Sequence, residues 1–75
     1  MTRDELIDIK AGDGIQFQWS PPRWTRRYEV LEIYARDVDR SGKLFVCGKV
    51  RFSEHSTMTF SAKEGDTTVR MVQDA

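Results

Sequence analysis

Hydrophobic and polar residues alternate along several short stretches of the chain, which is the period-two pattern of strands with one buried face. The first such stretch follows a glycine-rich turn at 11–14. It places Ile15, Phe17 and Trp19 on one side and glutamines on the other. The pattern predicts a strand whose inward row ends at Trp19.

A second stretch, residues 43–52, alternates in the same way. Its predicted inward row consists of Leu44, Val46, Gly48, Val50 and Phe52. A glycine in the middle of a strand is typical of a bulge or a sharp bend, which small barrels need at their corners. The pattern therefore predicts a strand that is irregular near Gly48.

Two further strands are predicted towards the end of the sequence. Residues 57–62 turn Met58, Phe60 and Ala62 inward, and residues 67–72 do the same with Val69 and Met71. The Glu-Gly-Asp sequence between them is typical of a turn. We expect these two strands to pair as a tight hairpin.

The segment 26–38 fits two patterns. As a helix it would carry an apolar stripe and begin at Thr25 as its cap. As a strand it would turn three residues inward: Leu31, Ile33 and Ala35. Periodicity alone does not decide, but the turn that follows leads directly into the strand at 43–52, as in a hairpin, and this favours the strand.

At the start of the chain, Thr2 or Asp4 can cap a helical turn that runs to Ile9, with acidic residues at the positive end of its dipole. A short helical turn and five strands predict an all-β fold. Seventy-five residues leave room for one domain, residues 1–75.

The order of these strands, with a Gly-Asp turn before the first and a longer loop before the second, resembles the small SH3-like barrels. The resemblance implies a five-stranded SH3-like barrel. Proteins of that fold bind nucleic acids, peptides or assembly partners, so the fold alone assigns no function.

Composition restricts the classes of function. Twelve basic and twelve acidic residues cancel, which argues against a nucleic-acid coat or a polybasic membrane binder. No apolar run is long enough to span a membrane, the polar start is unlike a secretory signal, and Cys47 stands alone. We therefore expect a cytoplasmic protein. Charge is nevertheless uneven, because residues 20–52 carry a net +4 and each flank carries −2.

The stretch 20–28 is the candidate binding loop, between the first two strands. Its two prolines fix their φ angles and lower the entropy lost on binding, while tryptophan and arginine are enriched in interface hot spots. The predicted partner-binding residues are Arg23, Trp24, Arg26, Arg27 and Tyr28. In the alternative interpretation, Trp24 folds back to plug the end of the barrel and the arginines are solvated or paired with nearby glutamates.

A second candidate site is a cationic strip on the second and third strands. Its members are Arg36, Arg40, Lys43, Lys49 and Arg51. Interleaved with aromatic residues, such a strip would suit single-stranded nucleic acid. In the alternative, acidic residues on the neighbouring strands neutralise it.

The sequence contains no catalytic or metal-binding constellation. His55 lies in a polar loop, where we expect a surface histidine, and Cys47 lies in a strand, where packing is its expected role. We therefore predict no cofactor, no metal and no enzymatic activity.

One enzyme family remains as a remote alternative. The Gly-Asp turn, the alternating strand, the loop with proline and arginine and the strand that starts at Arg27 resemble the opening of the PemK-like toxin ribonucleases. The resemblance covers residues 12–33 and carries over no catalytic residue.

The resulting functional prediction is a non-enzymatic binding module that engages a larger protein through its Trp/Arg loop, as inhibitor, adaptor or assembly component. Nucleic-acid binding by the basic middle is the alternative. The small size is typical of accessory proteins of phages and other mobile elements, which act in the host cytoplasm or in the virion.

Overall fold

The chain begins with one short helix, α1, at Arg3–Asp8. Thr2 caps it in the computed structural model, which describes residues 1–72. The Thr2 hydroxyl accepts a hydrogen bond from the Glu5 amide at 3.2 Å, and the Glu5 carboxylate accepts one from the Thr2 amide at 2.9 Å. This reciprocal capping box confirms the predicted helical turn. Leu6 and Ile9 point from it into the core.

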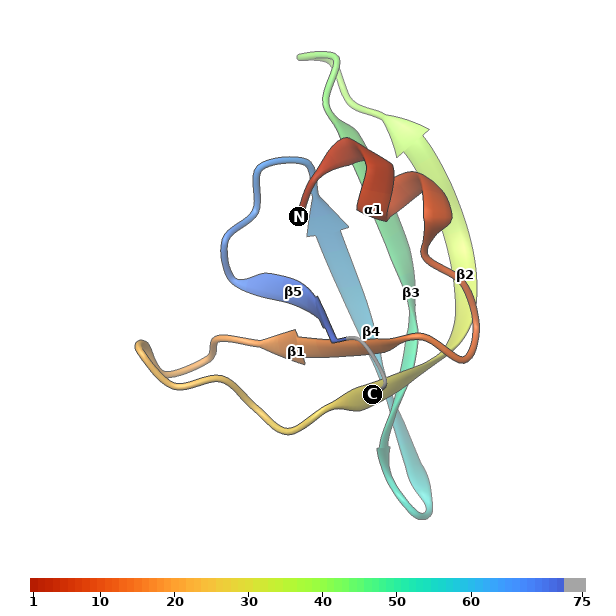
Figure 1. Ribbon diagram of the computed structural model, residues 1–75. Helices are drawn as coiled ribbons and strands as arrows, with labels where there is room; N and C mark the ends of the chain where they lie inside the picture. The colour runs from red at the N-terminus through yellow and green to blue at the C-terminus, as the bar shows by residue number, and fades with distance from the viewer. Residues whose placement is uncertain (73–75) are drawn as a thin grey trace.

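Five antiparallel strands follow and form one sheet in the order β4-β3-β2-β1-β5 (Figure 1). Their bounds are β1 at Gly14–Phe17, β2 at Tyr28–Val38, β3 at Leu44–Ser53, β4 at Ser56–Lys63 and β5 at Val69–Val72. The all-β prediction is confirmed. The ambiguous segment 26–38 contains a strand and no helix.

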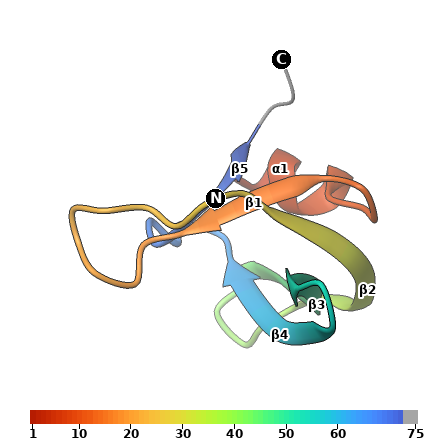
Figure 2. The same ribbon diagram turned by 90° about the horizontal axis from the view of Figure 1, so that it is seen from below.

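Strand β2 belongs to two layers of the molecule. Its first residues pair with β1, where Tyr28 lies opposite Ile15, and the rest pairs with β3, from Val30 opposite Val50 to Val38 opposite Leu44. The register shifts twice along the β2–β3 pair, which lets the strand curve. Figure 2 shows β2 passing from the layer of β1 and β5 to the layer of β3 and β4. The core lies between these layers.

Gly48 lies in the irregular part of the sheet, opposite Ile33 and between the two register shifts. A Cβ atom at this position would lie 2.4 Å from the carbonyl oxygen of Glu32 and 2.8 Å from a ring carbon of Phe60. The irregularity predicted near Gly48 is therefore present, with the register shifts in its pairing to β2. Glycine is required here by space.

The predicted hairpin between the last two strands is wrong. Strand β5 pairs with β1, where Val69 lies opposite Phe17 and Val72 opposite Gly14. After β4, Glu64 N donates to Leu44 O and extends the pairing with β3, and Gly65 N donates to Met1 O near the start of the chain, both at 2.8 Å. Strand β5 instead forms backbone hydrogen bonds with the edge of β1 that does not pair with β2.

The inward row predicted for β2 is right only in part. Ile33 is half-buried and packs against the core, but Leu31 is only half-buried and Ala35 is exposed, whereas Val30 and Tyr28 are buried. The register shifts change which side chains face the core, so alternation cannot be extended along the whole strand. The inward positions of β4 and β5 are as predicted, and those of β3 are as predicted up to Val50.

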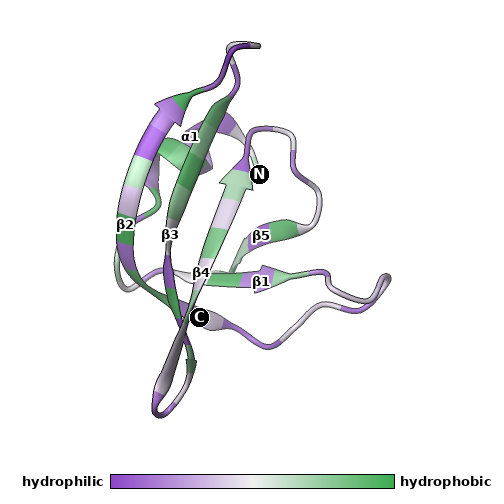
Figure 3. Cartoon of the chain, turned by 180° about the vertical axis from the view of Figure 1, so that it is seen from behind, coloured by the Kyte–Doolittle hydropathy of each residue, from purple (hydrophilic) through white to green (hydrophobic). Residues whose placement is uncertain are grey.

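The buried residues form one core. Its members are Leu6, Ile9, Ile15, Phe17, Tyr28, Val30, Leu44, Val46, Val50, Phe60, Ala62 and Val69. Figure 3 shows hydrophobic stretches along β1, β3, β4 and β5, while the ends of the two hairpins and the long loop after β1 are mostly hydrophilic. That loop projects from the side of the molecule (Figure 1).

Candidate binding surface

The loop at 18–27 is a closed extension of the β1–β2 pair. Thr25 holds it, because its amide donates to Phe17 O at 2.8 Å and its hydroxyl accepts from the Phe17 amide at 3.0 Å. At the tip, the Arg23 amide donates to Ser20 O at 2.9 Å, and the bond between Pro21 and Pro22 is cis. Hydrogen bonds at the base and at the tip of the loop thus fix its path.

Trp24 does not present its ring freely on this loop. It is half-buried, and the guanidinium carbon of Arg70 lies 4.1 Å from the centre of its ring. Arg70 is held in turn by Gln16, whose side-chain oxygen accepts from Arg70 Nε at 2.9 Å. The cation stacked on the ring stabilises the contact between the loop and β5. Trp24 therefore anchors the loop to the sheet. This role differs from both sequence-based interpretations, a freely exposed binding residue and a side chain that plugs the end of the barrel.

Trp19 occupies the opposite environment from the predicted one. Its side chain is 55% exposed, because β1 ends at Phe17 and the chain turns into the loop. The indole stacks on Phe17, with ring centres 5.7 Å apart and planes 12° apart, and lies 5.9 Å from the ring of Tyr28. Trp19 thus covers the edge of the core while it presents a face to solvent.

A second exposed aromatic residue lies on the other side of Tyr28. Phe52 is 41% exposed, and its ring is 6.0 Å from that of Tyr28 at an angle of 24°. It was predicted to face inward with the row of β3, but that row leaves the core after Val50. Trp19, Tyr28 and Phe52 form a continuous row of rings from two segments far apart in the sequence.

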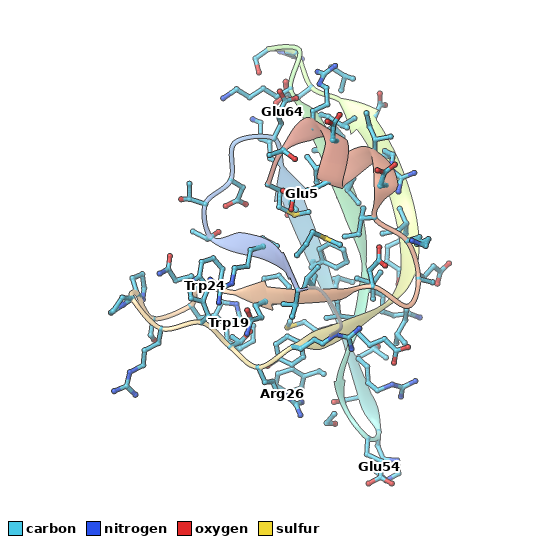
Figure 4. All side chains as sticks on the ribbon, viewed as in Figure 1. Glu5, Trp19, Trp24, Arg26, Glu54 and Glu64 are labelled. Atoms are coloured by element: carbon cyan, nitrogen blue, oxygen red, sulfur yellow. The ribbon has the colours of Figure 1, made fainter. Side chains whose placement is uncertain are left out.

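Arg26 completes this row. Its guanidinium carbon lies 5.0 Å from the centre of the Tyr28 ring, and its Nη2 donates to the carbonyl oxygen of Phe52. In Figure 4 the Arg26 side chain lies below β1, on the side of the molecule where the β3–β4 hairpin carries Glu54. We call Trp19, Arg26, Tyr28 and Phe52 the aromatic face.

A small hollow adjoins the aromatic face. It measures about 210 Å³ and is lined by Arg26, Arg27, Glu29, Arg51, Ser53 and Glu54. Arg27 lies across Gly14 and donates to the carbonyl oxygen of Gly12 at 3.2 Å. The lining of this hollow therefore includes three arginines and two glutamates. We call it the arginine hollow.

The predicted cationic strip is not continuous. Lys49 lies 3.8 Å from a Glu32 carboxylate oxygen and Arg51 lies 3.8 Å from one of Glu29, and Arg36 donates to the carbonyl oxygen of Ile9. The pairs of Lys49 and Arg51 correspond to the neutralising alternative, whereas the partner of Arg36 is a backbone carbonyl. Arg40 and Lys43 belong to the β2–β3 turn at the end of the molecule away from the β3–β4 hairpin (Figure 1). The five residues do not share one surface.

Two carboxylates at that far end have lowered pKa values. Lys63 lies 2.6 Å from Asp39 and, together with the Ser41 hydroxyl, holds the pKa of this carboxyl well below its usual range. The Leu44 amide, at 3.1 Å, and then Arg3, at 3.0 Å, lower the pKa of Glu64. These contacts tie the β2–β3 turn and α1 to the end of β4, so their role is structural.

The sequence also singled out His55 and Cys47. The His55 side chain is 90% exposed and its Nε2 lies 4.0 Å from a carboxylate oxygen of Glu54, and Cys47 is a half-buried free thiol. Among residues 1–72, no group of three or more histidine, cysteine, aspartate or glutamate side chains could hold a metal ion. Nor does this part of the chain include a helix with the length and apolar character needed to cross a membrane.

The aromatic face includes Arg26 and Tyr28, which the sequence suggested as partner-binding residues, and two residues that it did not suggest, Trp19 and Phe52. A signal for both is present in the sequence. Trp19 stands directly before Ser-Pro-Pro, and Phe52 is the last residue but one of β3, before the turn of the β3–β4 hairpin. An aromatic residue in the last positions of a predicted strand can lie beyond the cover of the opposite layer.

Comparisons with protein-family models, with curated proteins and with solved structures gave no match to this chain.

Proposed function

We propose that this protein is a non-enzymatic binding module that engages a larger protein through the aromatic face. One observation carries the proposal: two exposed rings, Trp19 and Phe52, flank Tyr28 and are held in place by stacking and by Arg26. Aromatic residues and arginine are the residues most enriched in interface hot spots. Rings that are already ordered also lose little entropy on binding.

The surroundings of the aromatic face support a protein as the partner. The net charge of the chain is zero, and the cations of the central strands are paired or dispersed. A nucleic-acid backbone carries a charge at each nucleotide and needs a continuous track of cations. A protein segment needs only a local match of apolar and charged groups, which the aromatic face and the arginine hollow offer.

For the fold we propose a partly open SH3-like barrel. The strand order β4-β3-β2-β1-β5 and the curved β2 shared between two layers support this assignment. The proposed binding surface then lies at one end of the barrel, beside the loop between its first two strands.

Single-stranded nucleic acid is the second candidate partner. The observation in its favour is Arg26 beside exposed rings, because bases stack on aromatic side chains while phosphates contact neighbouring cations. A titration with single-stranded RNA and DNA at low salt tests this candidate, and the integrity of the RNA afterwards tests the PemK-like ribonuclease alternative.

The experiment for the main proposal is a selection of displayed random peptides on the purified protein. The matched control is the double variant Trp19→Ser, Phe52→Ser, which removes both exposed rings. We expect peptides that bind the native protein and lose binding to the double variant, provided that the variant keeps its β-sheet circular dichroism spectrum. Peptides that bind both proteins equally, or no enrichment at all, would contradict the proposal.

A further inference from the structure

The arginine hollow and the aromatic face share one residue. Arg26 lines the hollow and also lies over Tyr28, and Ser53, another lining residue, directly follows Phe52. A ligand that covers the exposed rings therefore has a charged pocket beside it. The two features belong to one recognition surface.

The charge of the hollow indicates what enters it. Three arginines and two glutamates give its lining a formal charge of +1. The contact between Arg51 Nε and Glu29 Oε1 is long, at 3.8 Å, and both side chains are about half exposed. Such a pair holds its partners weakly. A guanidinium has five N–H donors in a fixed fork that matches a carboxylate, so Arg51 can exchange its loose contact for a two-point one.

We infer that the partner segment carries an aspartate or glutamate next to an apolar or aromatic side chain. The carboxylate enters the arginine hollow and accepts hydrogen bonds from Arg51 and Arg26, while the apolar neighbour lies on Trp19 and Phe52. This inference rests on the proposed function and names the chemistry that the protein partner must have.

A single carboxylate fits the hollow better than other anions do. Its one negative charge balances the formal charge of +1 on the lining, whereas a doubly charged phosphate group would leave a net charge of −1 beside Glu29 and Glu54. The phosphates of a nucleic-acid strand would need further cations in line with the hollow, but Arg40 and Lys43 lie in the turn at the other end of β2 and β3. Charge complementarity thus favours an acidic protein segment.

The test uses two capped peptides as probes, one of sequence Phe-Glu-Pro-Phe-Glu and the other with glutamine in place of both glutamates. Each is titrated into the ¹⁵N-labelled full chain, and the indole N–H of Trp19 and the Nε–H signals of Arg26, Arg27 and Arg51 are followed by NMR. We expect the acidic peptide to bind about tenfold more tightly, since its hydrogen bonds are charge-assisted.

Two variants localise the effect. In Arg51→Gln, the preference for the acidic peptide should disappear while Trp19 still responds to both peptides. The matched control, Arg40→Gln, removes the same charge at the opposite end and should keep the full preference. Because both side chains are exposed, neither substitution is expected to unfold the chain.

The outcomes separate this inference from the proposed function. If both peptides shift Trp19 with equal affinity, the carboxylate is not recognised and the inference is overturned while the proposed function stands. If neither peptide shifts Trp19, the inference is overturned, and the peptide selection then decides the proposed function. An oligothymidine strand that binds more tightly than the acidic peptide and shifts the same signals would overturn the inference in favour of a nucleic-acid partner.

Discussion

Replacing Trp19 with alanine measures how much of this side chain belongs to the core. A tryptophan can bury about 200 Å² of surface, and Trp19 is 55% exposed, so roughly 90 Å² of it is covered. At about 25 cal/mol per Å², the loss is worth about 2 kcal/mol. The matched core variant is Phe17→Ala, since Phe17 is only 6% exposed, and emptying such a site costs roughly 3–5 kcal/mol.

The assay is urea unfolding monitored by far-ultraviolet circular dichroism. This backbone signal does not depend on the fluorescence of the tryptophan that is removed. We expect the Trp19→Ala domain to fold and to lose about half as much stability as the Phe17→Ala domain loses. Equal losses for the two variants would mean that Trp19 is a core residue in solution. The aromatic face, and every argument that depends on its exposure, would then be refuted.

Three further predictions concern the scaffold. Gly48→Ala should lower the free energy of unfolding by about 1–3 kcal/mol, because the new methyl group meets the Glu32 carbonyl oxygen; an unchanged urea midpoint would count against the close approach of β2 and β3. Asp39 has a lower pKa in the folded chain than in the unfolded chain, so its contribution to stability is complete above about pH 4 and is lost as the pH falls through the folded value. The urea midpoint of the native protein should therefore fall in acid more steeply than that of Asp39→Asn, and parallel curves would contradict this. Thr25→Val should cost about 1 kcal/mol and speed hydrogen exchange at the Phe17 amide, which its hydroxyl protects; unchanged exchange would show that the loop is held by other contacts.

Most of the strands could be predicted because their side chains alternate over one half-buried face. The rows of β4 and β5 were right for this reason, and so was that of β3 up to Val50. Alternation reports which face a residue occupies only while the register is constant. Two register shifts in the β2–β3 pair break this condition, which is why Ala35 was predicted inward and is exposed.

The partner of β5 could not be read from the sequence for a different reason. The turn at 64–66 has the composition of a hairpin turn, and local composition says nothing of which strand edge is still unpaired. Strand β1 is only four residues long and pairs with β2 through two residue pairs, so β5 satisfies its other edge. That choice depends on the whole sheet and not on the turn.

The candidate site was located by composition, but the roles of its two tryptophans were exchanged. Trp19 continues the alternation of β1 and was placed inside, while Trp24 lies among prolines and arginines and was placed outside. Hydrogen bonds from Thr25 to Phe17 bring the loop back beside β1, and Arg70 of β5 then stacks on Trp24. The position of Trp24 therefore depends on β5, which lies more than forty residues further along the chain.

The aromatic face is exposed because the buried rows of β1 and β3 end before its exposed rings. The inward row of β1 ends at Phe17 and that of β3 ends at Val50, and each is followed two residues later by an aromatic side chain, Trp19 or Phe52. Both rings stay ordered because they stack on residues of the core, Trp19 on Phe17 and Phe52 on Tyr28. In a domain this small the core has no second layer at its end, so residues that close it must also face solvent. The same pair of rings thus covers the core and presents an apolar surface to a partner. This link between the fold and the proposed function predicts that the Trp19→Ala domain, although folded, binds more weakly and is less stable than the native domain.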